Sequence, residues 1–384
     1  KAIKLAMTAE MLEDMVPDWY SAEAYDTGEK FVFGADNGLT IDDLDGLTVE
    51  DPEYKEKMEL LLDQLTLEDM ETMICNNNYK FAPIESIGFE GMTTGEGPQG
   101  LSAWMSGISG VNFPVAMMVA QTWNVEIAAE EARLFAREAR AAGVGAYMAP
   151  ATNIHRTPYA GRNFEYYSED GWLSGEICAV EVAAIQSKGI YVFTKHFALN
   201  DQEEGRYGIS TWSNEQAIRE IYLEGFEGSV RGGGLGVMSS FNRIGVVWSG
   251  AHRGLMTGIL RDEWGMKGAA ITDCSVSAKY MDYRLGVLAG QDLWDGYSSG
   301  MATLDGLDDD PAIVTACQTA AKRIAFSISR SHAMNIGRAD IVLVFPWWKA
   351  LVIALLVVFA VLAIASVVML VLSVRKNKQV PAAG

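Results

Sequence analysis

The chain has 384 residues, of which 49% are hydrophobic and 38 are glycine, proportions that exclude a disordered protein and suit a globular α/β one. Its 50 acidic and 30 basic residues leave a formal net charge of −20, which argues against a nucleic-acid partner because a polyanion would be repelled. A neutral substrate such as a sugar is compatible with this charge.

The N-terminal segment is acidic and lacks the uninterrupted apolar run of a signal peptide. Because the chain also starts with lysine rather than methionine, we expect it to be part of a longer precursor with an upstream export signal. An engineered or proteolytic start is the alternative. Residues 1–57 are interpreted as an acidic linker with short structured pieces. One helix is expected over 54–65, and a second is expected to begin at Thr66, with two acidic residues in its first turn.

Residues 58–335 alternate between short apolar runs and longer helical patterns. The predicted strands lie at 143–150, 190–197, 235–241 and 268–274, and the predicted helices lie at 125–143, 173–189, 214–232 and 254–265. Strands that alternate with helices indicate parallel βαβ units, and about 270 residues of them suit one (β/α)₈ TIM-like barrel. A doubly wound sheet is the alternative, although no GxGxxG turn follows an early strand.

Polar residues at strand ends are the first candidates for chemistry, because active sites of such barrels lie at the carboxyl ends of the strands. Asp273 follows the apolar run GAAIT, where a buried carboxylate must be paired or functional; it could equally cap a following helix. Lys195 and His196 follow IYVFT and could hold a carboxylate or substrate hydroxyls, or only form ion pairs within the barrel. Arg162 and Glu165 lie in a loop rich in polar and aromatic residues, as sugar sites often do.

The cysteines and histidines show no metal-ligand spacing, so no metal or other cofactor is predicted. The cysteines, widely spaced and without a CxxC pair, are interpreted as four separate thiols: Cys75, Cys178, Cys274 and Cys317. Three scattered histidines, His155, His252 and His332, form no HExxH pattern.

The C-terminal run from Ala350 to Val374 contains no charged residue. A helix rises about 1.5 Å per residue, so a run of this length can cross a hydrocarbon core of about 30 Å. Tryptophans precede the run and basic residues follow it, so the positive-inside rule places the tail in the cytoplasm and the preceding chain outside the cell membrane. We therefore predict a juxtamembrane linker at 336–348 and a single transmembrane helix, embedded in the lipid bilayer, at 349–374. A cytoplasmic tail is predicted at 375–384. A buried core helix is the alternative.

Seven sequence blocks, in the same order throughout, resemble glycoside hydrolase family 3, the β-glucosidase family. They are LLDQLTLEDM, GEGPQG, FPVAMMVAQTWN, NIHRTPYAGRNFEYYSED, KHFALNDQEEGR, VMSSFNRIG and LRDEWGMKGAAITDC, which lie between residues 61 and 274. The resemblance implies a retaining, exo-acting β-glycosidase of the β-glucosidase type that acts on a β-linked glucoside or oligosaccharide. Asp273 would be the nucleophile that forms a covalent glycosyl-enzyme. The residues that would bind the sugar are Glu96, Arg162, Lys195, His196, Arg206 and Met238.

Three positions depart from the family pattern. Glu96 replaces an aspartate, Cys274 replaces a tryptophan that often follows the nucleophile, and Phe241 replaces a tyrosine. The acid/base residue is not assigned, because in the glucosidase-type members it comes from an α/β sandwich domain. We expect that domain upstream in the precursor or in a companion chain. The family's other source of the acid/base group is a His-Asp dyad on a barrel loop, which requires a PGHG sequence after KHF, and this chain lacks that sequence. Glu203 is interpreted as structural or substrate-binding.

These departures leave a second function open, a non-catalytic, membrane-anchored protein that uses the barrel to bind glycans or to assemble. The exact sugar is not defined by the sequence, and a homo-oligomer remains open.

Overall fold

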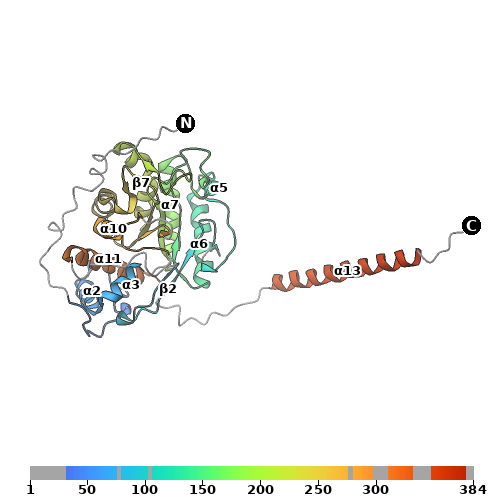
Figure 1. Cartoon of the computed structure of the whole chain (residues 1–384), viewed down its shortest axis with the longest axis horizontal. Coiled ribbons are helices and arrows are strands. Elements are labelled where there is room, and N and C mark those ends of the chain that lie inside the picture. Colours follow the sequence, from blue (N-terminus) through green and yellow to red (C-terminus); the bar gives the residue numbers. More distant parts are fainter. Residues whose placement is uncertain are drawn as a thin grey trace, which may run out of the picture. The chain divides into compact units, whose positions relative to one another are not determined.

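The computed structural model describes residues 32–75, 79–102, 106–275, 280–296, 310–331 and 347–377. The chain divides into two compact units, residues 1–337 and 338–384, which are described separately (Figure 1).

A six-stranded sheet forms the centre of the first unit, with the strand order β1-β2-β3-β4-β6-β9. The strands are β1 (Lys80–Phe81), β2 (Met92–Glu96), β3 (Val144–Met148), β4 (Tyr191–Phe197), β6 (Gly236–Ser239) and β9 (Ala270–Thr272). β1 runs antiparallel to β2, and every other neighbouring pair is parallel. β3, β4, β6 and β9 are buried at every position, as expected for parallel strands that are covered on both faces.

A three-stranded sheet, in the order β5-β7-β8, lies outside this core sheet. Its strands are β5 (Ser210–Thr211), β7 (Arg243–Ile244) and β8 (Val247–Trp248).

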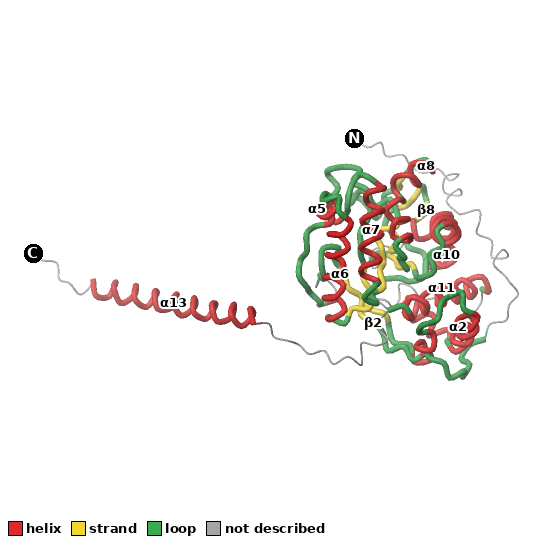
Figure 2. Tube along the Cα trace, turned by 180° about the vertical axis from the view of Figure 1, so that it is seen from behind, coloured by secondary structure: helices red, strands yellow, loops and turns green. Residues whose placement is uncertain are grey.

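Helices connect the parallel strands and surround the sheet (Figure 2). The connecting helices are α5 (Ala116–Ala120), α6 (Val125–Ala141), α7 (Gly171–Gln186), α8 (Glu215–Ala217), α9 (Glu224–Arg231) and the π-helical segments η5 (Ile218–Tyr222) and η7 (Gly254–Glu263). The other helices of the unit are η2 (Ile41–Leu44), α2 (Pro52–Gln64), α3 (Leu67–Cys75), η3 (Glu85–Ile87), η4 (Asn163–Glu165), η6 (Ser249–Ala251), α10 (Tyr283–Ala289) and α11 (Pro311–Ser329).

Several predicted helix boundaries are confirmed by their capping contacts. Thr66 and Asp69 form a reciprocal capping box at the start of α3, with each backbone N–H donating to the other side chain at 2.9 and 3.0 Å. Glycines with positive φ follow α6 and α7, at Gly143 and Gly189, as expected for helix C-termini. The predicted helix over 214–232 is instead divided into α8, η5 and α9.

The two edges of the sheet approach each other through loops. Leu293 forms a parallel bridge with Ile271 of β9, and the Trp294 N–H donates to the Ile74 carbonyl at 2.8 Å. Tyr79 connects to the other edge, because its carbonyl accepts from the Thr94 N–H of β2 at 3.0 Å. The sheet is therefore curled.

An eight-stranded (β/α)₈ barrel is not confirmed. Within the described residues the core sheet has six strands, and β1 is antiparallel to β2, whereas all strands of a (β/α)₈ barrel are parallel. The alternation of strands and helices is a local pattern, whereas the number of strands and the closure of a barrel depend on tilt and register between distant segments.

The described part of the segment before residue 57 packs into the core of the first unit. Ile41 and Leu44 are almost completely buried against residues of α2 and α11. The side chain of Gln64 also holds this segment, because it accepts from the Leu39 N–H and donates to the carbonyls of Leu39 and Ser86. The boundary predicted at residue 57 stays a prediction, and residues 1–31 lie outside the described residues.

The second unit contains the helix α13 (Trp347–Asn377). Its stretch Trp347–Ser373 is 27 residues long with a mean hydropathy of 3.3, and its side chains are exposed. By length and composition this helix can cross a membrane. The predicted span 349–374 lies within it, and its position in a bilayer stays a prediction.

Candidate active site

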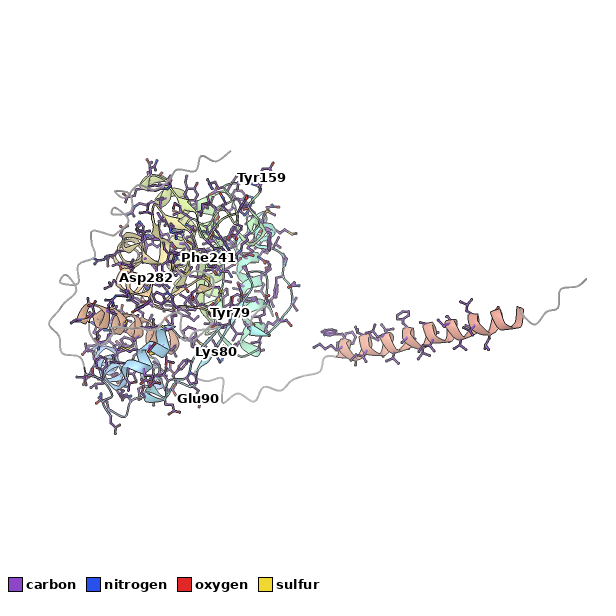
Figure 3. The ribbon with its side chains drawn as sticks, in the orientation of Figure 1. Tyr79, Lys80, Glu90, Tyr159, Phe241 and Asp282 are labelled. Carbon is purple, nitrogen blue, oxygen red and sulfur yellow. The ribbon has the colours of Figure 1, made fainter. Side chains whose placement is uncertain are left out.

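A pocket of about 750 Å³ lies at the carboxyl ends of the parallel strands. Tyr79 and Phe241, two of the residues that line it, are labelled in Figure 3. The pocket brings together six predicted site residues: Glu96, Arg162, Lys195, His196, Arg206 and Asp273. Glu96 ends β2, Lys195 and His196 belong to β4, and Asp273 directly follows β9. These side chains converge because the carboxyl ends of neighbouring parallel strands lie at one edge of the sheet.

Met238 is not among the described residues that line this pocket. It lies in β6, in register with Lys195 on one side and Ile271 on the other, and only 2% of its surface is exposed. The side chain belongs to the main hydrophobic core. The structure therefore gives no support for a direct contact between Met238 and a sugar.

The two carboxylate oxygens of Asp273 have different surroundings. Oδ1 accepts a hydrogen bond from the Cys274 N–H at 2.8 Å, and the Asp273 backbone N–H donates to the Ser239 carbonyl of β6 at 3.1 Å. Oδ2 is buried and has no hydrogen-bond partner among the described residues. Its neighbour is His196, whose Nε2 lies 3.6 Å away. One oxygen is thus held by the backbone while the other remains available for a reaction in the pocket.

Burial raises the pKa of Asp273 above its ordinary value, and four groups oppose this shift. They are the Arg162 and Arg206 guanidinium groups, the Cys274 N–H and the Lys195 ammonium group. The cations favour the ionised form, but desolvation outweighs them.

Each basic residue of the pocket has an acidic neighbour. Arg162 pairs with Glu165 at 2.6 Å, and Lys195, only 1% exposed, lies 3.5 Å from Glu96. Oε2 of Glu96 is buried without a hydrogen-bond partner in the described part of the chain. A ligand hydroxyl could therefore bond to Glu96 without displacing a protein group from that oxygen.

Arg206 is fixed by charge and by aromatic packing. Its Nη1 lies 2.9 Å from Oε2 of Glu203, and its guanidinium carbon lies 4.4 Å from the ring centre of Phe241. The same carbon lies 5.4 Å from the ring centre of Tyr207. These cation–π contacts orient the planar guanidinium group at the pocket wall.

His196 is held on its backbone and on its ring. Its N–H donates to Oδ1 of Asn153 at 2.8 Å, and Nδ2 of Asn153 donates back to the His196 carbonyl at 2.9 Å. Nδ1 of the ring lies 3.3 Å from the Tyr166 hydroxyl. Burial and the nearby Arg162, Lys195 and Arg206 charges hold the pKa of His196 well below its usual range. The imidazole is therefore neutral at physiological pH.

Sequence reasoning missed one buried carboxyl group beside the pocket. Asp295 is 1% exposed and accepts a hydrogen bond from the Tyr79 N–H at 3.2 Å. Burial raises its pKa to about 8, and the Asp273 and Glu96 charges add to the shift. It could not be found from a strand pattern, because it follows an isolated bridge rather than a strand.

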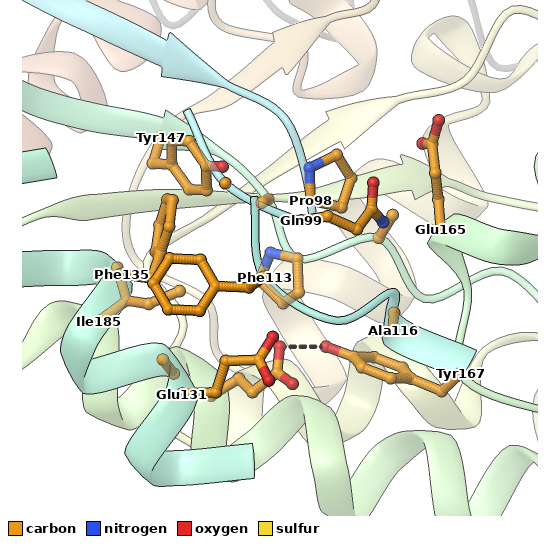
Figure 4. Close-up of a pocket in the computed structure, with 16 residues that line it drawn as sticks. Pro98, Gln99, Phe113, Ala116, Glu131, Phe135, Tyr147, Glu165, Tyr167 and Ile185 are labelled. Atoms are coloured by element: carbon orange, nitrogen blue, oxygen red, sulfur yellow. Dashed lines mark hydrogen bonds between the residues drawn. The ribbon is translucent and has the colours of Figure 1, made fainter. Parts of the chain in front are cut away.

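A second, much smaller cavity of about 20 Å³ lies between strands and the helices α6 and α7 (Figure 4). The Tyr167 hydroxyl donates to Oε2 of Glu181 at 2.6 Å, the bond that is dashed in Figure 4. Burial raises the pKa of Glu181 to about 8 and that of Glu131 to about 7. This volume holds about one water molecule, so the cavity cannot accept a sugar.

No group of three or more His, Cys, Asp or Glu side chains suited to a metal ion occurs in the described ranges.

Residues 92–291 match the glycosyl hydrolase family 3 N-terminal domain. Beta-glucosidase A from Butyrivibrio fibrisolvens is 36% identical over 270 residues, which cover 68% of this chain and 32% of that protein. Exo-alpha-(1->6)-L-arabinopyranosidase from Bifidobacterium breve is 34% identical over 221 residues, which cover 54% of this chain and 29% of that protein.

Among solved structures, beta-glucosidase 3B from Thermotoga neapolitana in complex with glucose superposes with a TM-score of 0.68 and 28% identity. The match covers 74% of this chain and 44% of that one. The chain spans about a third of the length of the curated relatives that it matches.

Proposed function

The chain belongs to glycosyl hydrolase family 3, and on this premise we propose that it is the nucleophile-bearing part of a retaining, exo-acting β-glycosidase. The observation that carries the proposal is the position of Asp273. Its Oδ2 is buried and without a hydrogen-bond partner in the described structure, in a pocket that also contains Arg162, Lys195 and Arg206.

The reaction proceeds in two steps on this residue. Oδ2 of Asp273 attacks the anomeric carbon while the glycosidic C–O bond breaks. The electron pair of the broken bond stays with the aglycone oxygen, which takes a proton from a general acid. Water then attacks the same carbon and gives one proton to the same acid/base group. At the same time the bond between that carbon and Oδ2 of Asp273 breaks. The sugar is released with retained configuration.

The general acid is proposed to come from outside this chain, in an α/β sandwich domain upstream or in a companion chain. Two facts support this. The chain spans about a third of the length of its curated relatives. Besides Asp273, the carboxyl groups that line the pocket are each engaged in an ion pair, with Lys195, Arg162 and Arg206 respectively: Glu96, Glu165 and Glu203. A retaining enzyme needs a second carboxyl group about 5–5.5 Å from the nucleophile.

The proposed substrate is a β-glucoside, because most of the similar proteins are named as β-glucosidases. The relative named as an arabinopyranosidase suggests an alternative substrate, whose sugar lacks the exocyclic hydroxymethyl group of glucose. Comparing aryl β-glucosides with aryl α-L-arabinopyranosides on the complete protein distinguishes the two substrates.

Membrane anchoring by α13 is part of the proposal, with the catalytic unit outside the cell and the tail in the cytoplasm. The apolar stretch Trp347–Ser373, the tryptophans at its start and the basic residues Arg375, Lys376 and Lys378 after it support this topology. Extraction with alkaline carbonate should leave the chain in the membrane. Protease added to intact cells should remove the first unit and spare a C-terminal tag; loss of the tag instead would reverse the topology.

A fluorinated β-glucoside with a dinitrophenolate leaving group tests the nucleophile without the missing acid. Dinitrophenolate leaves without protonation, so the glycosylation step does not depend on the external domain. Mass spectrometry of the full chain should find the fluoroglucosyl group on the peptide that contains Asp273, and Asp273→Asn should abolish it. A label on another carboxylate, or none on a folded chain that binds glucose, would contradict the proposal.

A second candidate, a non-catalytic glycan-binding protein, is favoured by one observation. Glu96 lies 3.5 Å from Lys195 and competes with a substrate for this cation. This function predicts glycan binding without turnover, and it predicts that Asp273→Asn leaves the binding function intact.

A further inference from the structure

A continuous series of polar contacts connects Arg206 to His196, two residues that line the pocket. Oε2 of Glu203 lies 2.9 Å from Nη1 of Arg206, and Oε1 of Glu203 lies 3.0 Å from Nδ2 of Asn200. The same Nδ2 lies 3.2 Å from the Tyr166 hydroxyl, which in turn lies 3.3 Å from Nδ1 of His196. The Tyr166 and Asn200 side chains are almost completely buried.

The direction of each hydrogen bond in this series follows from the chemistry of its members. The Glu203 carboxylate, paired with a guanidinium group, can only accept, so the Asn200 amide must turn its NH₂ group toward it. The second hydrogen of that NH₂ group then points to the Tyr166 oxygen. The buried Tyr166 hydrogen also needs an acceptor, and Nδ1 of His196 is the other hydrogen-bond partner of this hydroxyl among the described residues, so the hydroxyl donates to Nδ1.

An Nδ1 that accepts a hydrogen bond carries no proton. In a neutral imidazole the single proton must then be on Nε2. Nε2 is the ring nitrogen that faces Oδ2 of Asp273, at 3.6 Å. That separation is longer than a hydrogen bond, so Asp273 biases the tautomer only through space, whereas Tyr166 contacts Nδ1 directly.

We propose that Tyr166 is a positioning residue that holds His196 as the Nε2–H tautomer, so that the pocket presents a hydrogen-bond donor toward Asp273. The assignment of the tautomer stands on the contacts alone; its catalytic consequence rests on the proposed function.

The consequence concerns the oxygen that attacks the sugar. With the proton on Nε2, the neutral ring directs an N–H donor toward Oδ2 of Asp273 or toward a sugar hydroxyl bound between them. With the proton on Nδ1, the Nε2 lone pair would face the carboxylate and repel it. Tyr166 thereby acts on the nucleophile through His196, without lining the pocket itself.

Nitrogen NMR of the full chain labelled with ¹⁵N-histidine tests the proposal directly, because the two ring nitrogens give distinct signals when protonated and unprotonated. The His196 signals are assigned by their loss in His196→Gln. The comparison is made in an Asp273→Asn background, where the charge of the nucleophile no longer biases the ring. We expect His196 to remain a single Nε2–H tautomer in Asp273→Asn and to become a mixture when Tyr166→Phe is added.

Tyr167→Phe is the matched control, because the neighbouring hydroxyl donates to Glu181 in the small second cavity. It should leave the His196 signals unchanged. A protonated Nδ1 in Asp273→Asn, or a single Nε2–H tautomer that survives Tyr166→Phe, would overturn the proposal. Neither readout requires activity, so failure of the proposed function is recognised separately, by the absence of glycosyl labelling on Asp273.

A kinetic measurement then tests the consequence in the complete protein. Loss of one neutral hydrogen bond that orients the site should lower kcat by about tenfold in Tyr166→Phe while KM changes little. A fall in kcat that Tyr167→Phe reproduces would show a general structural effect and would contradict the positioning role.

Discussion

Nε2 of His196 and Oδ2 of Asp273 lie 3.6 Å apart, and the pKa of each group is displaced from its ordinary range. Burial makes the imidazole a weaker base and the carboxyl group a weaker acid. At neutral pH the pair therefore consists of a neutral ring and a carboxylate whose proton affinity is increased.

The first prediction concerns the pH dependence of glycosylation. The proposed nucleophile must be ionised to react, so a raised pKa of Asp273 moves the acidic limb of the labelling rate to a higher pH than an ordinary aspartate would give. His196 does not contribute a limb near pH 6.5, because its pKa lies well below that value. Rates of labelling measured between about pH 3 and 8 check this. A limb at the ordinary aspartate value would contradict it.

The second prediction concerns Arg206, whose charge lowers the pKa of Asp273. Arg206→Gln removes this charge, so the pKa of Asp273 rises further and the acidic limb moves to still higher pH. Arg219→Gln is the control, since Arg219 forms its ion pairs with Glu215 and Glu263 on the surface. An unchanged limb in Arg206→Gln, in a protein that is still labelled, would show that the Arg206 charge does not act on the nucleophile.

The third prediction concerns Glu181 in the second cavity. Its pKa is about 8 in the folded protein and near 4.5 when unfolded, so the folded state binds its proton more tightly. The stabilisation is complete below the unfolded pKa and is lost as pH rises from about 4.5 to 8, by up to about 1 kcal/mol per pH unit. Glu181→Gln keeps an oxygen that accepts from Tyr167 and removes the titration.

Denaturant unfolding at pH 5 and pH 8 checks this expectation. The free energy of unfolding should fall less between these pH values in Glu181→Gln than in the unmodified chain. Glu59→Gln, on the exposed side of α2, should change neither value by more than about 0.5 kcal/mol. An identical pH dependence in Glu181→Gln and the unmodified chain would be incompatible with a raised pKa at Glu181.

The fourth prediction concerns the close crossing of α7 and α9. A β-carbon on Gly228 would collide with the backbone of Gly175, so Gly228→Ala should destabilise the fold by about 1–3 kcal/mol. Gly258→Ala is the matched control, because a β-carbon there meets no atom within 4 Å. Gly258→Ala should be neutral or stabilising by about 0.5 kcal/mol. Equal unfolding midpoints for the two variants would contradict the close packing of α9 against α7 at Gly228 and Gly175.

Some features of the site could be predicted because they are local in the chain. The apolar run before Asp273 identified a buried strand, and the Lys195–His196 pair at the end of another strand was recognised in the same way. Parallel strands then bring their carboxyl ends together, which is why the strand-end residues Glu96, Lys195, His196 and Asp273 share one pocket. Arg162 and Arg206 reach the same pocket from loops.

Other features could not be predicted because they depend on register and on contacts between distant segments. Met238 is in the core because of its position in β6 between two neighbouring strands. Asp295 is bonded by Tyr79, a residue 216 positions away. The series from Glu203 through Asn200 and Tyr166 to His196 needs a loop before α7 to pack on residues after β4.

Motifs, periodicity and hydropathy are properties of consecutive residues, so the family, the strand-end residues and the long apolar helix could all be predicted from the amino-acid sequence. Three other features depend on tertiary structure. They are the six strands of the core sheet in the described residues, the hydrogen bond that holds one oxygen of Asp273 but not the other, and the position of Nδ1 of His196 beside the Tyr166 hydroxyl. Burial and hydrogen-bond partners set protonation, and both arise only when segments far apart in the chain pack together.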